Sequence, residues 1–332
     1  MKKNILVTGA AGFIGSFLCE ALVACGYNVV GIDNFFRGSA ANLSTLSPPH
    51  FILEELDLSA AKHIQPLQKI LRHHRIEIVF HLAAINGTQY FYDQPLFVFD
   101  QNIKITQNLL AAIESTGVNY LIYSSSSEVY GDPLIIPTDE KHPIMLNISS
   151  DRDSYAASKA AADFYVRLFA QHHHMSCLIL RIFNLYGERM VGTKYGQVVA
   201  EFVTRMLHEE RFTLIGDGSQ TRSFCYVKDA IWIIKQLMEK NITGLVNVGS
   251  AAEISILKLA QLLHALEHRP FDPVFLPPRA GDHQRRQPNI SYLHALVPNI
   301  VFTPLESGLE KVIEYYRTRP GASNHTLLGP DT

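Results

Sequence analysis

Short apolar runs alternate with longer amphipathic stretches through the first half of the chain. The runs are rich in Val, Ile, Leu and Phe and end in glycine or polar residues, which is typical of buried strands. The stretches between them carry apolar residues at helical spacing. The predicted strands cover residues 5–8, 28–32, 51–56, 77–84, 120–123 and 180–187. Strands that alternate with helices predict an α/β fold with a doubly wound parallel sheet, whose ligands bind beyond the carboxyl ends of the strands.

The first predicted strand runs into three glycines, Gly9, Gly12 and Gly15, and a helical pattern follows at once. Glycines let the backbone turn sharply and approach a pyrophosphate, and the N–H groups that begin the helix face its charge. Gly15 would also let the helix pack closely on the sheet. The spacing is G-x-x-G-x-x-G and not the commoner G-x-G-x-x-G, and a tight turn without a ligand tolerates the same glycines. A dinucleotide site is therefore one of two interpretations of this turn.

An acidic residue, Asp33, follows the second predicted strand. It lies about 20 residues beyond the glycine turn, where a carboxylate accepts a hydrogen bond from the ribose 2′-hydroxyl of a dinucleotide. The carboxylate also repels a 2′-phosphate, which favours NAD over NADP. The fourth predicted strand ends in His81-Leu82-Ala83-Ala84, whose small residues leave room for a cofactor against the sheet.

Composition and charge exclude several classes of function. Apolar residues make up 47% of the 332 residues and charged residues 18%, and the formal net charge is −2. This balance gives no electrostatic footprint for nucleic acid or an anionic membrane, and no apolar run approaches the roughly 18 residues of a membrane helix. The four scattered cysteines predict reduced thiols in a cytoplasmic protein. The patches His73-His74 and His172-His173-His174 coincide with predicted helix ends, which favours solvated termini over a metal site.

Two further motifs lie near the predicted carboxyl edge of the sheet. Serines 124–127 and then Glu128 follow the fifth predicted strand, at a place where a serine run is otherwise most often a solvated loop. Tyr155 and Lys159 lie four residues apart on a predicted alanine-rich helix, and therefore on one face of it. A lysine ammonium near a phenol stabilises the phenolate and lowers the pKa of the tyrosine, which can then act as a base near neutral pH. Alone, the Tyr-x-x-x-Lys spacing is a frequent chance match.

Together these motifs resemble the extended short-chain dehydrogenase/reductase family and, within it, the nucleotide-sugar epimerase/dehydratase branch. The resemblance rests on the glycine turn, Asp33, Asp57-Leu58, the His81–Ala84 run, Ser126 and Tyr155-x-x-x-Lys159, in that order, and it covers residues 3–318. It implies a Rossmann-type NAD-binding domain over residues 1–190, with returning segments around 220–250. A smaller, interleaved nucleotide-sugar region is expected over residues 191–320. Residues 321–332 show no periodicity and are expected to form a disordered tail.

The resemblance implies bound NAD and a common first step. The expected cofactor-binding residues are Gly9, Gly12, Phe13, Ile14, Gly15, Asp33, Asn34, Asp57, Leu58, Leu82, Ala83, Ala84, Asn102, Tyr155 and Lys159. In the implied step, C4 of the sugar loses a hydride to NAD while Tyr155 takes the 4-hydroxyl proton. Ser126 hydrogen-bonds the same oxygen, and Lys159 holds the nicotinamide ribose and tunes Tyr155.

Segments of the second half look like the nucleotide-sugar site of the same family. The expected substrate-binding residues are Ser127, Asn184, Ile215, Arg222, Arg279 and Asp282. The two arginines make chemical sense there, because a guanidinium offers paired donors to phosphate oxygens. A UDP-sugar is the expected substrate. The resemblance also implies a homodimer built on the helices around residues 106–115 and 156–169.

The residues leave the fate of the 4-ketone open. Returning the hydride to the other face is epimerisation, losing the C6 hydroxyl is 4,6-dehydration, and losing CO₂ from a uronic acid gives a pentose. Glu128 bears on the choice, because a plain 4-epimerase has no need of a second base. Ser127 stands where dTDP-glucose dehydratases carry an acid, so that reaction is in doubt.

The segment Ser127-Glu128 is similar both to UDP-glucuronate decarboxylases and to GDP-mannose 4,6-dehydratases. The segment Arg285-Arg286-Gln287-Pro288 favours the decarboxylase, whereas residues 85–92 depart from the substrate loop expected of it. We expect a decarboxylase-like enzyme, with dehydration or epimerisation as the alternative. A dehydrogenase with net NADH release and a non-catalytic NAD-binding module are the other classes, although a sensor would not need Ser126, Tyr155 and Lys159 together.

Overall fold

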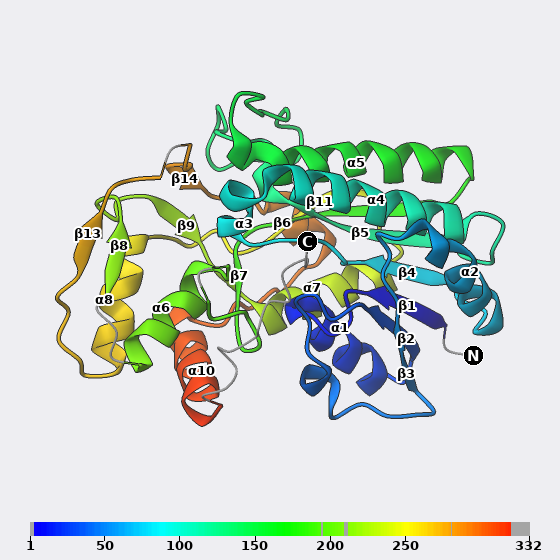
Figure 1. Ribbon diagram of the computed structural model, residues 1–332, viewed down its shortest axis with the longest axis horizontal. Coiled ribbons are helices and arrows are strands. Elements are labelled where there is room, and N and C mark those ends of the chain that lie inside the picture. The colour runs from blue at the N-terminus through cyan, green and yellow to red at the C-terminus, as the bar shows by residue number, and fades with distance from the viewer. Residues whose placement is uncertain (1–2, 194, 209–211, 280, 320–332) are drawn as a thin grey trace.

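Seven parallel strands form the central sheet of the protein (Figure 1). The computed structural model describes residues 3–193, 195–208, 212–279 and 281–319. The strands lie in the order β11-β6-β5-β4-β1-β2-β3. Their bounds are β1 Asn4–Thr8, β2 Asn28–Asp33, β3 Phe51–Glu55, β4 Ile78–His81, β5 Tyr120–Ser126, β6 Ser176–Ile182 and β11 Gly244–Val248. This order reverses direction between β1 and β4, which creates a crevice at the carboxyl ends of those strands.

Helices cover both faces of the sheet, as Figure 1 shows. The helices α2 (Ile64–His73), α4 (Pro95–Ile113) and α5 (Ser154–His172) pack on one face, and α1 (Phe13–Ala24) and α7 (Val227–Glu239) on the other. Sheets buried on both faces require nearly continuous apolar strands, and all four residues of β4 are buried. The predicted doubly wound α/β fold is confirmed.

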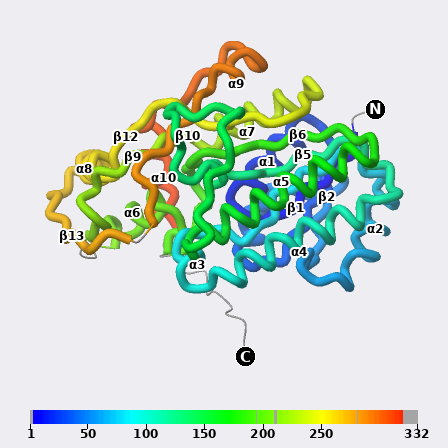
Figure 2. Tube along the Cα trace, turned by 90° about the horizontal axis from the view of Figure 1, so that it is seen from above, coloured from blue at the N-terminus to red at the C-terminus, as the bar shows by residue number. Residues whose placement is uncertain are grey.

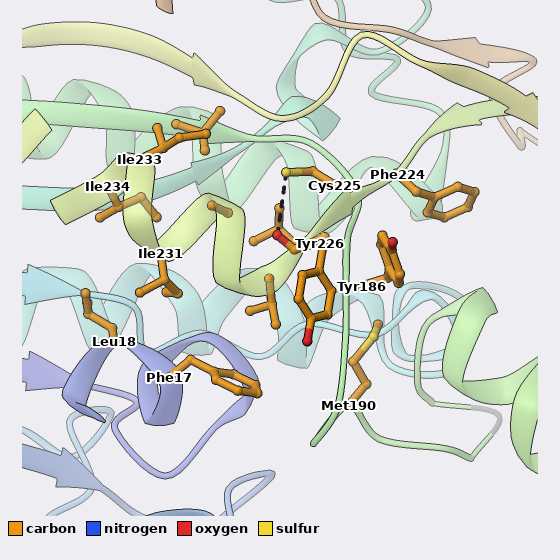
Figure 3. Close-up of a cluster of buried hydrophobic side chains, with 14 of the residues drawn as sticks. Phe17, Leu18, Tyr186, Met190, Phe224, Cys225, Tyr226, Ile231, Ile233 and Ile234 are labelled. Carbon is orange, nitrogen blue, oxygen red and sulfur yellow. Dashed lines mark hydrogen bonds between the residues drawn. The ribbon is translucent and has the colours of Figure 1, made fainter. Parts of the chain in front are cut away.

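The largest hydrophobic cluster among the described residues joins α1 to α7 (Figure 3). Figure 3 shows Phe17 and Leu18 of α1 on the same side of the sheet as Ile231 and Ile234 of α7. Leu18 and Ile234 are fully buried. Since α7 follows residue 226, this packing ties the second half of the chain to the glycine-turn helix, and it fixes the position of that helix on the sheet.

Most of the remaining elements gather beside the carboxyl ends of the strands, on the side of the molecule where α6, α8 and α10 lie, whereas α9 packs against β11 of the central sheet (Figure 2). They include three small sheets, β7–β10, β12–β9–β14 and β8–β13. The helices are α3 (Thr88–Asp93), α6 (Val198–Leu207), α8 (Ile256–Leu266), α9 (Ser291–Leu296) and α10 (Leu305–Thr318). The strands are β7 (Leu185–Tyr186), β8 (Thr213–Ile215), β9 (Thr221–Ser223), β10 (Cys225–Tyr226), β12 (Glu253–Ser255), β13 (Val274–Leu276) and β14 (Arg285–Arg286). The division at residue 190 stays a prediction, and β11 lies in the central sheet.

Three strands differ from the predicted ones by more than one residue. In place of the predicted strand over residues 180–187, β6 spans Ser176–Ile182 and Leu185–Tyr186 form the separate strand β7. The fifth strand continues through the serine run to Ser126, because Ser124 and Ser125 pair with β6. The fourth ends at His81, because the next two N–H groups, of Leu82 and Ala83, donate to Thr8 Oγ1 at 3.1 Å. Residues 321–332 lie outside the described part of the chain. No helix among the described residues has the length and apolar character to cross a bilayer.

Candidate active site

A cavity of about 820 Å³ opens beyond the carboxyl ends of the strands. The glycine turn, the ends of β2, β4 and β5, and the start of α5 line one part of it. Residues from β8, β9 and the segment before β14 line the other part. The cavity therefore lies between the central sheet and the elements beside it. This is the edge of the sheet at which the sequence predicts a ligand site.

The glycine turn has geometry that side chains would block. Gly9 has a φ of +69°, and a Cβ there would lie 3.0 Å from the backbone nitrogen of Ala83. A Cβ on Gly15 would lie 2.0 Å from the carbonyl oxygen of Gly9, so helix α1 rests directly on the turn. The Gly12 N–H donates to the same carbonyl at 3.1 Å, and α1 begins at the next residue. The helix N-terminus thus opens into the cavity, as anion binding requires.

Asp33 lies beside this turn at the end of β2. It is buried, and its carboxylate oxygens accept N–H groups from Ala11 at 2.9 Å and Phe35 at 2.8 Å. Burial raises the pKa of Asp33, while the backbone N–H groups act in the opposite direction. Each oxygen keeps a further lone pair, which can accept a ribose hydroxyl.

Nearly all of the expected cofactor-binding residues line the cavity. They are Gly9, Gly12, Phe13, Ile14, Gly15, Asp33, Asn34, Asp57, Leu58, Leu82, Ala83, Ala84, Tyr155 and Lys159. Asn102 lies behind the lining: its Oδ1 accepts the Ile85 N–H at 2.7 Å, and its Nδ2 donates to Ser158 Oγ at 3.2 Å. It braces the loop after β4 against α5. The glycine cradle, the Asp33 acceptor and the small residues after β4 together fit a dinucleotide.

Tyr155 and Ser126 meet in the middle of the cavity. The Tyr155 ring stacks on Phe91 with centroids 4.7 Å apart and an interplanar angle of 9°, and the Ser126 hydroxyl lies near enough to lower the pKa of its phenol. Lys159 is buried, and its ammonium donates to the carbonyl of Ser124 at 2.7 Å and lies 4.8 Å from the centroid of the Tyr123 ring. The three expected residues are brought together, although Lys159 points at the strand.

Burial shifts the pKa values of both Tyr155 and Lys159. Burial raises the pKa of Tyr155, and the Glu128 carboxylate raises it further. Burial lowers the pKa of Lys159 to about 8, so its charge near Tyr155 is partly lost just above neutral pH. The groups that lower the pKa of Tyr155 are Ser126 and the Arg37 guanidinium. In this arrangement the Lys159 ammonium faces the Ser124 carbonyl, and the tuning of the phenol by Lys159 stays a prediction.

Glu128 is held by two buried guanidiniums. It sits in a 3₁₀ turn, Ser127–Tyr130, directly after β5. Arg152, in the 3₁₀ turn before α5, donates from Nη1 to Glu128 Oε2 at 2.7 Å. Arg286, on β14, donates to Oε1 of the same carboxylate. The two arginine side chains are 4% and 2% exposed, so both ion pairs lie away from bulk water.

The arginines fix the charge of this carboxylate. Burial alone would raise the pKa of Glu128, but Arg286 and Arg152 lower it far below its usual range. The same contact raises the pKa of Arg152. Glu128 is therefore an anion across the neutral pH range and a weak base, since proton abstraction works best when the pKa of the base lies near the working pH.

The charged groups continue from Glu128 toward the expected nucleotide end. Asp282 lies 3.6 Å from Arg152 and 3.3 Å from Arg222, so it joins these two arginines. Arg279 donates to Gln89 Oε1 at 3.5 Å. The cavity is lined by all six expected substrate-binding residues, Ser127, Asn184, Ile215, Arg222, Arg279 and Asp282. In this network three guanidiniums, of Arg152, Arg222 and Arg286, face two carboxylates, which leaves one positive charge in excess.

Sequence reasoning gave no role to Arg37, Arg152 or His283. The position of Arg152 could have indicated a partner, because a positive charge just before a helix is unfavourable next to the helix dipole unless a negative group lies close to it. Arg37 donates to the carbonyl of Tyr195 at 3.1 Å and reaches Tyr155 electrostatically across the cavity. His283 approaches Glu128 from a segment 155 residues further along the chain, and no local sequence pattern indicates this contact.

Comparison with known proteins connects this geometry to named relatives. A model of the NAD dependent epimerase/dehydratase family matches residues 5–249. UDP-glucuronic acid decarboxylase 1 of Danio rerio is 34% identical over 316 residues, which cover 95% of this chain and 73% of that protein.

Two solved structures share the fold over nearly the whole chain. The UDP-N-acetylglucosamine 4-epimerase of Methanobrevibacter ruminantium M1, in complex with UDP-N-acetylmuramic acid, is 30% identical with a TM-score of 0.85, covering 96% of this chain and 100% of that one. The UDP-glucuronic acid 4-epimerase of Bacillus cereus, in complex with UDP-glucuronic acid and NAD, is 30% identical with a TM-score of 0.83, covering 95% and 99%.

Proposed function

From the premise that the chain belongs to the NAD-dependent epimerase/dehydratase family, we propose that it decarboxylates a UDP-linked uronic acid, with UDP-glucuronate as the first candidate. One observation carries the choice. Glu128 lies between two buried guanidiniums, and the network around them has a positive charge in excess. A substrate that brings a carboxylate to this place would neutralise that charge.

The residues around Tyr155 prepare the sugar for this reaction. Bound NAD supplies the acceptor for the C4 hydride and returns it at the end of the cycle. Tyr155 takes the proton of the 4-hydroxyl, and Ser126, which lies near the phenol, hydrogen-bonds the same oxygen of the sugar. The pKa of Tyr155 is raised by burial, so the proton is returned readily when the hydride comes back.

The ketone at C4 then activates the carboxylate on C5. The C5–C6 bond breaks, its electron pair stays on C5 and is shared with the ketone, and CO₂ leaves as a neutral molecule. Arg152, which lines the cavity, can hold the carboxylate beforehand and keeps its charge throughout, while Arg286 holds Glu128 from outside the cavity lining. C5 finally takes up one proton, so each turnover consumes one proton from solvent.

The charge state of Glu128 speaks against 4,6-dehydration. That reaction needs a base to remove the C5 proton, and the two arginines make Glu128 a weak one. Decarboxylation needs no such base, because the electron pair comes from the bond to the departing carboxylate. Epimerisation at C4 of the same uronate is the second candidate, and the likeness to the Bacillus cereus 4-epimerase supports it.

Product analysis separates these reactions. The protein is incubated with UDP-glucuronate, UDP-glucose, dTDP-glucose and GDP-mannose, and products are identified by NMR with CO₂ measured in parallel. We expect CO₂ and a UDP-pentose from UDP-glucuronate alone. Stoichiometric release of NADH would point to a net dehydrogenase, and retained NAD binding without turnover on any sugar would point to a non-catalytic module.

We also propose a homodimer built on α4 and α5, in the cytoplasm. These helices pack side by side and leave Phe164, Tyr165 and Leu168 of α5 half exposed on one helix, an apolar surface that a second copy would cover. The four cysteines are all free, which suits a reducing compartment. Light scattering should give twice the chain mass, and Leu168→Glu should give the monomer; an unmodified monomer would contradict the dimer.

A further inference from the structure

Arg37 is an arginine of the cavity lining that has no carboxylate partner. Six arginines line the cavity among the residues that the structure describes. Four of the six lie within 3.3 Å of a carboxylate oxygen: Arg152, Arg189, Arg205 and Arg222. The other two are Arg279, which is expected to bind the diphosphate of the nucleotide sugar, and Arg37. The cavity thus contains one further cation whose anionic partner is not part of the described chain.

The side chain of Arg37 passes over the carboxyl end of β1. Arg37 follows β2, and the next two residues rest on the glycine turn: a Cβ on Gly38 would lie 2.9 Å from the Ala11 backbone carbon, and the Ser39 N–H donates to the Ala11 carbonyl at 3.0 Å. The guanidinium ends beside Gly87, in the segment after β4, where a Cβ would lie 2.4 Å from Arg37 Nη1. Since β1 lies between β2 and β4 in the sheet, the side chain crosses the end of β1, where the glycine turn begins.

The protein uses few of the donors on this guanidinium. Among the described residues its one hydrogen bond runs from Nη2 to the Tyr195 carbonyl at 3.1 Å, and its buried Nη1 has no acceptor. The Tyr90 ring centroid lies 5.8 Å from the guanidinium carbon. A guanidinium has five N–H groups, so most of them are left for a ligand. Burial lowers the pKa of Arg37 to about 10, which still leaves the full positive charge at neutral pH.

The glycine turn lies where a ligand could supply the missing negative charge. The diphosphate of a dinucleotide carries two negative charges, and the N-terminus of α1 offers it only the partial charges of backbone N–H groups. Arg189 is already paired with Glu20 of α1 at 2.8 Å, and Lys159 donates to the Ser124 carbonyl. A buried charge without a partner is unfavourable, and a diphosphate at the turn would remove this cost for Arg37.

We propose that Arg37 binds the diphosphate of NAD together with the N-terminus of α1, and so closes the cofactor end of the cavity over the glycine turn. The Tyr195 carbonyl holds the guanidinium in place. The inference rests on NAD as the cofactor and is independent of the reaction at the sugar. Arg37 adds affinity without choosing between NAD and NADP, because these differ at the 2′-hydroxyl, which is the part expected at Asp33.

Nucleotides that differ in their phosphates test this contact. The protein, freed of nucleotide, is titrated calorimetrically with adenosine, ADP, NAD and NADP, and separately with UDP-glucuronate. For Arg37→Gln we expect the Kd values of ADP and NAD to rise about 10–100-fold, since a charged hydrogen-bond partner is lost, while the Kd of adenosine stays the same. NADP should weaken by the same factor as NAD. The fall of NAD affinity with rising salt should be shallower in the variant.

Stability separates a ligand contact from a structural role. Without nucleotide, the unfolding midpoint of Arg37→Gln should not fall, because the variant loses a buried charge that has no counter-ion. NAD should raise that midpoint less in the variant than in the unmodified protein. Arg37→Lys keeps the charge but not the paired donors, and it should lose less affinity than Arg37→Gln. The control is Arg205→Gln, whose guanidinium lines the same cavity but is paired with Glu201 at 2.8 Å, and its NAD affinity should be unchanged.

The outcomes separate this contact from its alternatives. Unchanged Kd values for ADP and NAD in Arg37→Gln would overturn the proposal. So would a loss confined to NADP, which would assign Arg37 to a 2′-phosphate, or a loss confined to UDP-glucuronate, which would assign it to the substrate. Adenosine weakened as much as ADP would show a structural role only. If Arg37→Gln does not fold, the affinities of Arg37→Lys for adenosine and ADP decide. No CO₂ is measured here, so failure of the proposed decarboxylation would leave this result intact.

Discussion

The two ends of the cavity are built in different ways. The cofactor end is made of backbone: the Gly9–Gly15 turn and the N-terminus of α1, with Asp33 held by two N–H groups. The substrate end is made of charged side chains, in which Glu128 on one turn meets Arg152 and Arg286 from other segments. The first end fits NAD, with Asp33 set against a 2′-phosphate, whereas the second end, under the proposed function, selects a sugar that carries a carboxylate. Changes at one end should therefore leave the other intact.

Tyr155 stands between the two ends, and its loss should have the largest effect. Tyr155→Phe removes the group that takes the 4-hydroxyl proton, and turnover should fall about 10²–10⁴-fold. NAD binding and the unfolding midpoint should change little, since the ring keeps its stacking on Phe91. Steady-state rates with NAD titration measure both effects. Near-normal turnover would place the base elsewhere.

Arg286 tests whether the substrate end selects a carboxylate. Arg286→Gln removes one of the two guanidiniums on Glu128, and kcat/KM for UDP-glucuronate should fall on the order of 10²–10³-fold, as expected when a buried ion pair loses a partner. Affinity for NAD should stay the same. The matched control is Arg285→Gln, the neighbouring arginine, which pairs with Glu253 at the surface. Equal losses of kcat/KM in Arg286→Gln and Arg285→Gln would contradict the claim that the buried arginine at the substrate end selects a carboxylate.

Glu128 gives a stability effect with a definite sign. The pKa of Glu128 is lower in the folded protein than the value of about 4.3 expected in the unfolded chain. The contribution of Glu128 to the free energy of unfolding is therefore complete above that unfolded pKa, and it is lost as the pH falls toward the pKa in the folded protein. Glu128→Gln should lower the free energy of unfolding by about 3 kcal/mol at pH 7, because two buried guanidiniums lose their partner. Urea unfolding at pH 7 and at pH 4 should show this difference shrinking in acid. A difference that is constant with pH would show that the Glu128 pKa is not lowered.

The smallest expected effect lies at the cofactor end. Asp33→Ala removes the acceptor for the ribose diol and should weaken NAD binding by about 1–3 kcal/mol. The preference for NAD over NADP should narrow, because the carboxylate that repels a 2′-phosphate is gone. Calorimetric titration with both cofactors measures this. If the unmodified protein bound NAD and NADP equally, the role given to Asp33 would be wrong.

The cofactor end could be predicted from sequence because it is local. The turn and helix start lie within Asn4–Gly15, and the alternation of strands and helices places Asp33 and the residues after β4 at the same edge. Strand ends were less predictable. Ser124 and Ser125 continue β5 only because β6 lies alongside, and Leu82 and Ala83 leave β4 because Thr8 offers an acceptor.

The substrate end could be predicted only in part. Ser126, Glu128 and Tyr155 were found through a family resemblance, but the state of Glu128 depends on Arg286, which lies 158 residues away. The hydrogen bond from Lys159 to the Ser124 carbonyl, 35 residues earlier in the chain, could not be predicted from the Tyr-x-x-x-Lys spacing either. Long-range charge pairs leave no periodic signal in the sequence, and for that reason Arg152 and His283 were missed.

The most direct test of the central claim is turnover of UDP-glucuronate in heavy water, followed by NMR and by CO₂ measurement. The account predicts CO₂ and a UDP-pentose with one solvent deuterium at C5 and the original hydrogen back at C4. That result would mean that the charged end of the cavity binds a carboxylate and releases it as CO₂. A C4 epimer that keeps its carboxylate and all its carbon-bound hydrogens, with no CO₂, would contradict the account.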